Sequence, residues 1–319
     1  APGIATAEKE YAEALKRRVG AKADKDAWLI SRDTPAGAAI TKKFGGEPRY
    51  LSDRRFKLAY EATAEPFAAA NVRLRYLREM EAAEQALAVR GVIEQIRPLG
   101  GTLDIVTKGG MARTAVDNAV PFMPRDWILR SNKLGPMATK QVQRGSYSSG
   151  KGKLNISGAK HWKEGLAPDP RSMGLSGYGI RIPPTHQKQA NALFQAGNNS
   201  TATHELMHRL EHADPRLGLL ERNLVLRRTT LADGSREKVV RLQDVFPDEG
   251  YGWMERTRVD QWANPYTGKV YYNPYAEFHE VATMGMESVI GQASAQMARY
   301  KGKEDTELRH FVLGLLAGF

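Results

Sequence analysis

The chain of 319 residues contains no cysteine. This absence excludes disulfide bonds, thiolate zinc fingers, iron–sulfur clusters and cysteine nucleophiles. The sequence also lacks an apolar run near the roughly 20 residues that span a bilayer, so we expect no membrane partner. No targeting segment is visible at its start. Hydrophobic residues at 41% and charged residues at 26% are typical of a globular protein, which excludes wholesale disorder.

Basic residues outnumber acidic residues by 47 to 36, which gives a formal net charge of +11. This excess favours a polyanionic partner or substrate, with a charge that serves only solubility as the alternative. A dense part of it, here called the basic stripe, is interleaved with Trp127, Tyr147 and Trp162 and is opposed in the sequence by Asp126. The stripe predicts contact with a phosphate backbone such as that of DNA, or else a solvated rim. Its members are Arg125, Arg130, Lys133, Lys140, Arg144, Lys151 and Lys153, followed by Lys160 and Lys163.

The composition changes near residue 110, and we predict two regions that meet there. Residues 1–110 are expected to form a mainly α-helical region, because segments such as 6–19 and 67–89 carry apolar residues at helical spacing. These apolar faces serve either core packing or an arm for assembly or partner binding. Residues 111–319 mix short strands, turns and isolated helices, and the alternation in 153–157 predicts a strand. The predicted fold class is therefore α+β.

A candidate metal site lies in residues 200–215, which read STATHELMHRLEHADP. His204 and His208 are four apart on a predicted helix, so their imidazoles project from one face and can share a metal ion. Glu205 is close enough to reach a water molecule at that metal. Two surface histidines with Glu205 paired to Arg209 are the alternative. We expect the helix to begin after 197–200 (GNNS), which would separate it from another helix over 185–196.

A zinc peptidase site needs a third protein ligand. His212 is a poor candidate because it lies about 12 Å along the helix from His204, at 1.5 Å per residue. A second helix, predicted over 273–290, offers a carboxylate instead. Glu280 and Glu277, one turn earlier, are the two alternatives. Glu287 lies two turns beyond Glu280, where it could hydrogen-bond a ligating histidine from outside the metal's own ligand set.

The segments PRDWILRSN, RGSY, STATHELMHRLEH, RRT, YTGKVYY and HEVATMGMES resemble, in this order, the zincin-like metallopeptidase domain of bacteriophage minor head and portal-associated proteins. The resemblance covers roughly residues 120–290. It implies a gluzincin-type domain with a small mixed sheet and an active-site helix, with Zn2+ as the cofactor and Glu280 as the third ligand. It also implies that a tyrosine of YTGKVYY, first Tyr271 and second Tyr266, donates to the oxyanion. Packing on a hairpin around Gly268 is the alternative for these tyrosines.

Together these features predict zinc-dependent hydrolysis of peptide bonds by a phage virion-associated enzyme, with water activated by Glu205 and the oxyanion stabilised by zinc and Tyr271. The strand 153–157 is expected to be the edge that pairs with an extended substrate. The expected partners are a protein or peptide substrate, portal or capsid proteins and DNA, in the virion or in the host cytoplasm during assembly. A structural, DNA-contacting virion protein with little turnover is the main alternative. A cell-wall hydrolase is a third interpretation, disfavoured because no wall-binding repeat is visible.

Overall fold

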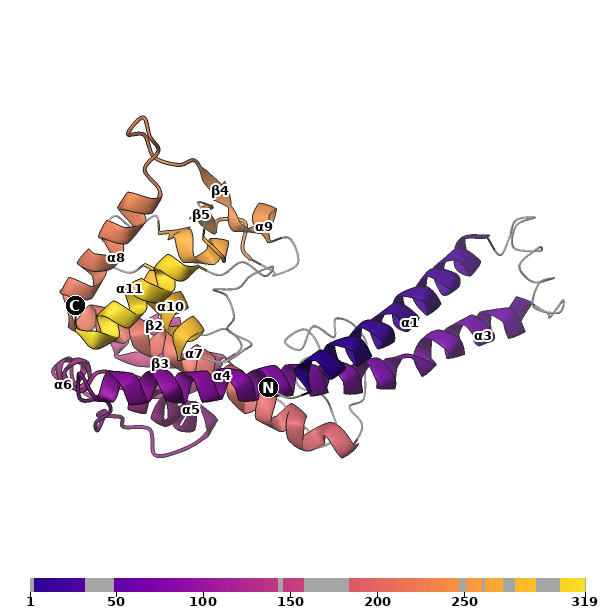
Figure 1. The fold of residues 1–319 in the computed structure, drawn as a ribbon, viewed down its shortest axis with the longest axis horizontal. Helices are drawn as coiled ribbons and strands as arrows, with labels where there is room; N and C mark the ends of the chain where they lie inside the picture. The colour runs from indigo at the N-terminus through magenta and orange to yellow at the C-terminus, as the bar shows by residue number, and fades with distance from the viewer. Residues whose placement is uncertain are drawn as a thin grey trace. The chain divides into compact units, whose positions relative to one another are not determined.

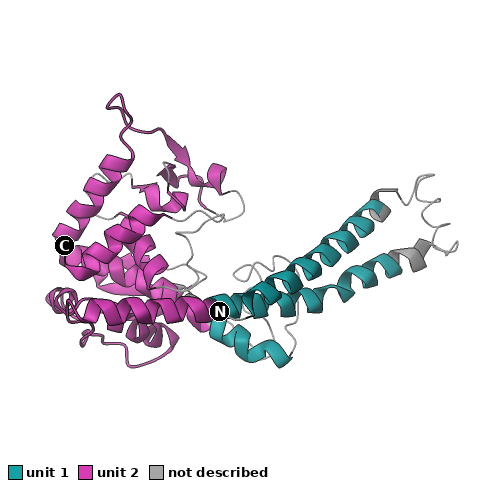
Figure 2. Cartoon of the chain, in the orientation of Figure 1, with its two compact units in different colours: residues 1–78, 161–193 teal, residues 79–160, 194–319 magenta. Residues whose placement is uncertain are grey.

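The computed structural model describes residues 3–31, 49–142, 146–157, 184–246, 251–259, 262–271, 279–290 and 305–318. The fold is mixed α+β, as the sequence predicts, with long helices and two small sheets (Figure 1). Contacts between Cα atoms divide the chain into two compact units (Figure 2). Unit 1 comprises residues 1–78 and 161–193, and unit 2 comprises residues 79–160 and 194–319. The predicted boundary at residue 110 falls inside unit 2.

Unit 1 is a set of packed helices. It contains α1 (Ile4–Ser31), α3 (Arg49–Ala62), the first half of α4 (Ala64–Glu94), η3 (Pro184–His186) and the start of α7 (Gln187–Ala213). The segments 6–19 and 67–89, predicted to be helical, lie within α1 and α4. Arg18 of α1 donates a hydrogen bond of 2.9 Å to Tyr60 of α3. Tyr11 packs on Phe67, which lies in a small buried core with Val72. Pro66 is tolerated because it occupies the first turn of α4.

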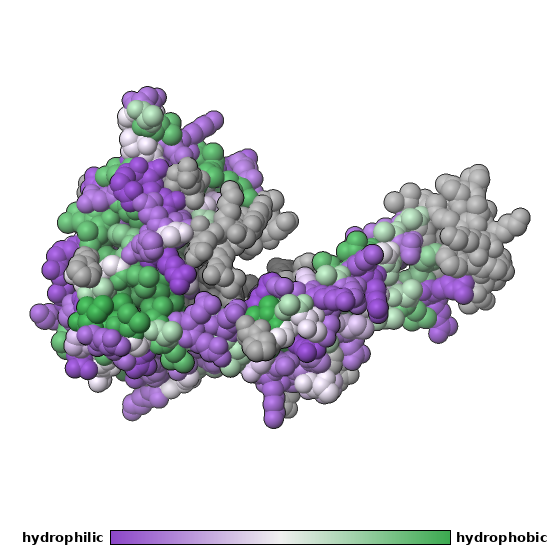
Figure 3. Space-filling model, in the orientation of Figure 1, coloured by the Kyte–Doolittle hydropathy of each residue, from purple (hydrophilic) through white to green (hydrophobic). Residues whose placement is uncertain are grey.

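Unit 2 is built around one hydrophobic core that draws on helices and strands throughout its length. Its helices, besides the ends of α4 and α7, are α5 (Met111–Ala119), η1 (Val120–Phe122), α6 (Arg125–Asn132), η2 (Ser149–Lys151), α8 (Pro215–Arg228), α9 (Leu242–Val245), η4 (Pro265–Gly268), α10 (Val281–Val289) and α11 (Thr306–Ala317). On the face shown in Figure 3, apolar side chains gather on this unit near the C-terminus. Among the described residues, no helix combines the length and apolar character that crossing a membrane requires.

Each sheet of unit 2 has three strands. The first contains β1 (Ala138–Val142), β2 (Ser146–Ser148) and β3 (Lys153–Ser157), and the second contains β4 (Val239–Arg241), β5 (Arg256–Arg258) and β6 (Lys269–Val270). In the first sheet, β3 lies between β1, to which it is parallel, and β2, to which it is antiparallel. The expectation that residues 153–157 form a free edge for substrate is therefore wrong, because both edges of that strand are already paired. The second sheet is antiparallel, in the order β4-β5-β6.

Helix α7 runs unbroken from Gln187 to Ala213, so the predicted break at 197–200 is wrong. Two polar side chains of that segment, Asn199 and Ser200, find partners inside the fold rather than ending the helix. Ser200 donates a hydrogen bond of 3.1 Å to Glu287 Oε2, and Asn199 accepts one of 3.0 Å from Gln195. Tertiary contacts have here overridden the local preference of these residues for caps and turns. The helix ends, as predicted, at Asp214, which caps α8 by accepting from Arg216 N.

Helix α10 begins later than predicted, with Glu280 as its N-cap and Val281 as its first residue. Glu280 therefore lies at the end of this helix, and both it and Glu287 contact His204. Residues 272–278, including Glu277, lie outside the described part of the chain. Helix α10 is almost entirely buried and packs closely on α11, where a Cβ atom added at Gly285 would overlap Val312 Cγ2. Glycine allows that close approach.

Candidate metal centre

His204 and His208 occupy successive turns of α7, on the side of the helix that faces the N-terminus of α10. Their ring centroids are 5.0 Å apart and the rings meet edge to face. Both side chains are largely buried, with 12% and 10% of their surface exposed. The helix is held in this orientation by the opposite packing of Ala202, Leu206 and Leu210, which are fully buried in the core of unit 2. The sequence pattern thus places the two imidazoles as predicted, side by side.

Glu280 completes a cluster of three potential metal ligands. Its Oε2 atom lies 3.1 Å from His204 Nε2 and 3.5 Å from His208 Nε2. One ligand atom from each of the three residues lies within 4.8 Å of the others. Ligands about 2.0–2.1 Å from a tetrahedral zinc ion are about 3.3 Å apart. The two nitrogens and one carboxylate oxygen therefore suit zinc both in spacing and in chemistry.

A carboxylate group contacts the Nδ1 atom of each histidine, the ring nitrogen that faces away from Glu280. His204 Nδ1 lies 2.5 Å from Glu287 Oε1, and His208 Nδ1 lies 3.0 Å from Glu211 Oε2. Metal-binding histidines commonly donate their second nitrogen to such a carboxylate, which fixes the ring and its tautomer. The sequence predicts this position for Glu287. It gave no expectation for Glu211, although its spacing of three from His208 on a helix was an available signal.

The three residues form a tightly coupled electrostatic group. Burial lowers the pKa of His204, but Glu287 and Glu280 together raise it well above its usual range. Burial also lowers the pKa of His208, but Glu211 and Glu280 outweigh this effect and raise it to about 9. Burial would raise the pKa of Glu280, but the two histidines hold it well below its usual range. A metal ion must therefore displace protons from these imidazoles in order to bind.

Glu205 lies beside this cluster with 5% of its surface exposed. Burial raises its pKa, against the opposing influence of His204 and His208. The alternative pairing with Arg209 does not occur, because Arg209 donates to Ser131 and to the carbonyl oxygen of Gly135. A carboxyl group with a raised pKa beside a metal site is suited to accept and return a proton.

Both tyrosines singled out in YTGKVYY lie at the cluster. The hydroxyl of Tyr271 donates to Glu280 Oε1, while 36% of the residue remains exposed. The ring of Tyr266 lies 6.4 Å from that of His204, and its hydroxyl accepts a hydrogen bond of 2.9 Å from Lys269. The role of Tyr271 as a donor to an oxyanion stays a prediction. The alternative, packing of these tyrosines around Gly268, also stays a prediction; the atoms closest to a Cβ built at Gly268 belong to Arg258 and Trp262.

Glu221 of α8 is a buried contributor that sequence reasoning missed. It is fully buried and accepts a hydrogen bond of 2.9 Å from the backbone N–H of Ala282, in the first turn of α10. Burial, and then the neighbouring carboxyl of Glu211, raise its pKa well above the usual range. Glu221 therefore ties α8 to the end of α10 that carries Glu280. Its lone position in the sequence offered no pattern to identify it.

His212 lies outside the cluster, as its distance along the helix predicts. Its Nδ1 atom is 2.9 Å from the hydroxyl of Tyr147 on β2.

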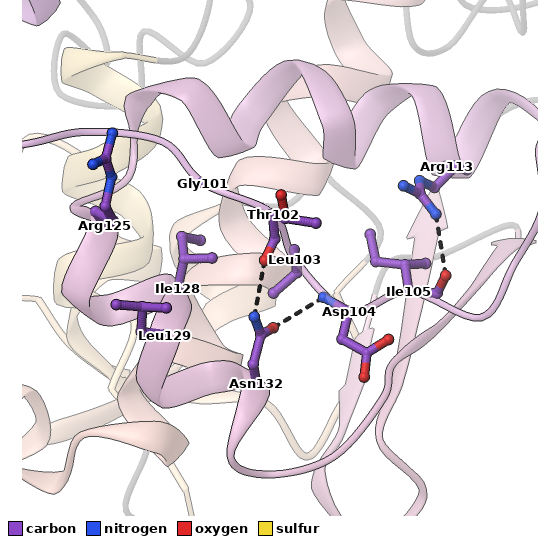
Figure 4. Close-up of a pocket in the computed structure, with 10 residues that line it drawn as sticks. All are labelled: Gly101, Thr102, Leu103, Asp104, Ile105, Arg113, Arg125, Ile128, Leu129 and Asn132. Carbon is purple, nitrogen blue, oxygen red and sulfur yellow. Dashed lines mark hydrogen bonds between the residues drawn. The ribbon is translucent and has the colours of Figure 1, made fainter.

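A cavity of about 680 Å³ between α6 and the segment 101–105 is also distinct from the cluster (Figure 4). There, the amide of Asn132 bridges Thr102 O and Asp104 N, with its oxygen and nitrogen both engaged. None of the residues that line this cavity belongs to the histidine–glutamate cluster.

The basic stripe is partly neutralised in the folded chain. Arg130 pairs with Asp214 as well as with Asp126, so a counter-charge comes from a residue that is remote in sequence. Arg125 lines the cavity of Figure 4. The exposed members are Arg125, Lys133, Lys140 and Lys151, Lys153 is half-buried, and Arg144, Lys160 and Lys163 lie outside the described residues. The nucleic-acid contact stays a prediction.

Compared with models of known protein families, with curated proteins and with solved structures, the chain shows no match. Its function is therefore inferred from the residues of the site and from the sequence motifs.

Proposed function

We propose that the chain is a zinc-dependent peptidase of the gluzincin type, with His204, His208 and Glu280 as the metal ligands. The observation that carries this proposal is the convergence of these three ligand atoms within 4.8 Å of one another. The outer carboxylates on both histidines give it further support, because they orient each Nε2 atom toward the common centre. Three protein ligands leave a fourth position open for water or substrate, which is typical of catalytic zinc sites.

A zinc ion held by His204, His208 and Glu280 would act as the Lewis acid that polarises a peptide carbonyl and acidifies water. Glu205 takes a proton from the attacking water and gives it to the leaving amine, and its raised pKa suits both transfers. The Tyr271 hydroxyl, once released from Glu280, donates to the oxyanion, and its partial exposure leaves it access to substrate. Glu287 and Glu211 keep the two imidazoles oriented throughout.

The substrate class in this proposal is an extended protein or peptide segment. The resemblance to the phage domain supports a virion protein or a host protein as the target. Strands β1 and β2 are the two edges of the first sheet, and residues 104–107 cover the outer side of β1 through hydrogen bonds to Met137 and Thr139. Strand β2 pairs with β3 on its inner side. It replaces β3 in the proposal as the strand to which an extended substrate adds.

The proposal is tested by the hydrolysis of unstructured casein by the wild-type chain and by Glu205→Gln, with metal content measured in both. We expect the wild type to cleave casein and to lose activity with a chelator. Glu205→Gln should retain the metal and lose nearly all activity. Glu84→Gln, which changes an exposed glutamate of α4, is the matched control and should behave as the wild type. Full activity in Glu205→Gln would refute the assignment of the proton-transfer residue.

A further inference from the structure

The two carboxylate oxygens of Glu280 have different neighbours. Oε2 faces both histidines and also accepts a hydrogen bond of 3.2 Å from Thr283. Oε1 faces the other way, accepts from the Tyr271 hydroxyl and lies 3.6 Å from Lys269 Nζ, an ion-pair distance. One oxygen is thus directed at the proposed metal position, and the other is held by side chains of β6 and the residue that follows it.

Lys269 is itself fixed in place. Its side chain is only 12% exposed, although lysine usually extends its ammonium group into water. The ammonium donates to Tyr266 at 2.9 Å and pairs with Glu255 at 3.3 Å. It also lies 4.6 Å and 4.9 Å from the ring centroids of Tyr266 and Tyr271, where cation–π attraction adds to its stability. These contacts fix the ammonium group of Lys269 beside Glu280.

We propose that Lys269 is a positioning residue that, with Tyr271, holds Oε1 of Glu280 away from the metal, so that Glu280 binds through one oxygen. This inference rests on the proposed function. A carboxylate can bind a metal through one or both oxygens, and the second oxygen would add a ligand beside the water, which raises the coordination number and hinders the approach of substrate to the metal. By occupying Oε1, Lys269 and Tyr271 keep the metal at four ligands before substrate binds, and Lys269 still holds Oε1 when the Tyr271 hydroxyl turns to the oxyanion.

A merely structural lysine has different consequences. If Lys269 only neutralised buried carboxylates, its loss would weaken folding and metal binding but would leave the coordination of any bound metal unchanged. If it holds Oε1, its loss frees that oxygen to bind. The bound metal then gains a ligand. The affinity of the chain for the metal does not fall, because the new bond between the metal and Oε1 offsets the loss of the contacts that ordered Glu280.

Cobalt(II) substitution distinguishes the two, because the visible absorption of this ion is intense in four-coordinate sites and weak at higher coordination. We expect cobalt in the wild type to give an intense visible band. In Lys269→Met, the bound cobalt should lose most of that intensity without a loss of affinity. Lys269→Arg, which keeps the charge, should restore the band, and Lys238→Met, at an exposed lysine just before β4, should match the wild type. Tyr271→Phe removes the other donor to Oε1 and should weaken the band in the same way.

An unchanged band in Lys269→Met and Tyr271→Phe would overturn the inference and leave the proposed function standing. If Lys269→Met fails to fold by circular dichroism, Tyr271→Phe decides the question with the same readout. A wild-type chain that binds neither cobalt nor zinc would instead refute the proposed function itself. The two failures are therefore distinguishable.

Discussion

Glu287 fixes the ring of His204, so Glu287→Gln should weaken metal binding without removing a ligand. Glu287 Oε1 lies 2.5 Å from His204 Nδ1, and Oε2 accepts a hydrogen bond from Ser200. Glutamine keeps the size of the side chain but loses the negative charge that favours donation from Nδ1. Loss of such an outer partner typically lowers metal affinity by about 10–100-fold. That factor corresponds to about 1.4–2.7 kcal/mol of binding free energy.

The affinity of the wild type and of Glu287→Gln can be measured by competition with a chromophoric chelator at fixed pH. Glu84→Gln serves again as the control for loss of one negative charge. An unchanged affinity would refute the role assigned to Glu287. A loss as complete as that caused by removal of His204 would also contradict it, because it would make Glu287 a ligand in its own right.

Three further predictions concern stability and protonation. Gly285→Ala should destabilise the fold by about 1–3 kcal/mol, because the added Cβ overlaps Val312 Cγ2 on α11 and overpacks the core; an unchanged midpoint of urea unfolding would contradict this. Asp214→Ala should cost at least the about 0.5–2 kcal/mol of the lost α8 cap, because it also removes the ion pairs of Asp214 with Arg130 and Arg216; its thermal unfolding, compared with that of Asp233→Ala in an exposed turn, checks this estimate. The metal-free chain should lose stability as the pH rises from about 6.5 to about 9, because the folded state raises the pKa of His208 and so favours its protonated form; a free energy of unfolding, measured with urea, that increases over this range would refute the sign.

The sequence predicted the local part of the site well because that part depends on helical periodicity. Residues four apart on a helix face the same way, so His204 and His208 lie side by side wherever the helix packs. Glu280 and Glu287 came from a separate segment, and their meeting with His204 also required the correct approach of α10. The order of the motifs along the chain predicts that Glu280 meets the two histidines. The composition and spacing of residues 273–290 do not predict this by themselves.

Other features depend on tertiary contacts that periodicity does not encode. Glu221 reaches the site from α8 through one backbone N–H of α10, and Lys269 reaches it from a two-residue strand. The continuity of α7 through 197–200 depends on partners such as Glu287, which lies far along the chain. The central place of β3 depends on pairing with β1 and β2, whereas alternation predicts only that a strand exists.

The metal content of the purified chain tests the central claim most directly. Elemental analysis should find about one zinc ion per wild-type chain and about one in His310→Ala, which removes an exposed histidine of α11. His204→Ala should contain none, because it removes one of the three ligands. Absence of zinc from the wild type, even after reconstitution, or retention of zinc by His204→Ala, would contradict the metal centre proposed for this protein.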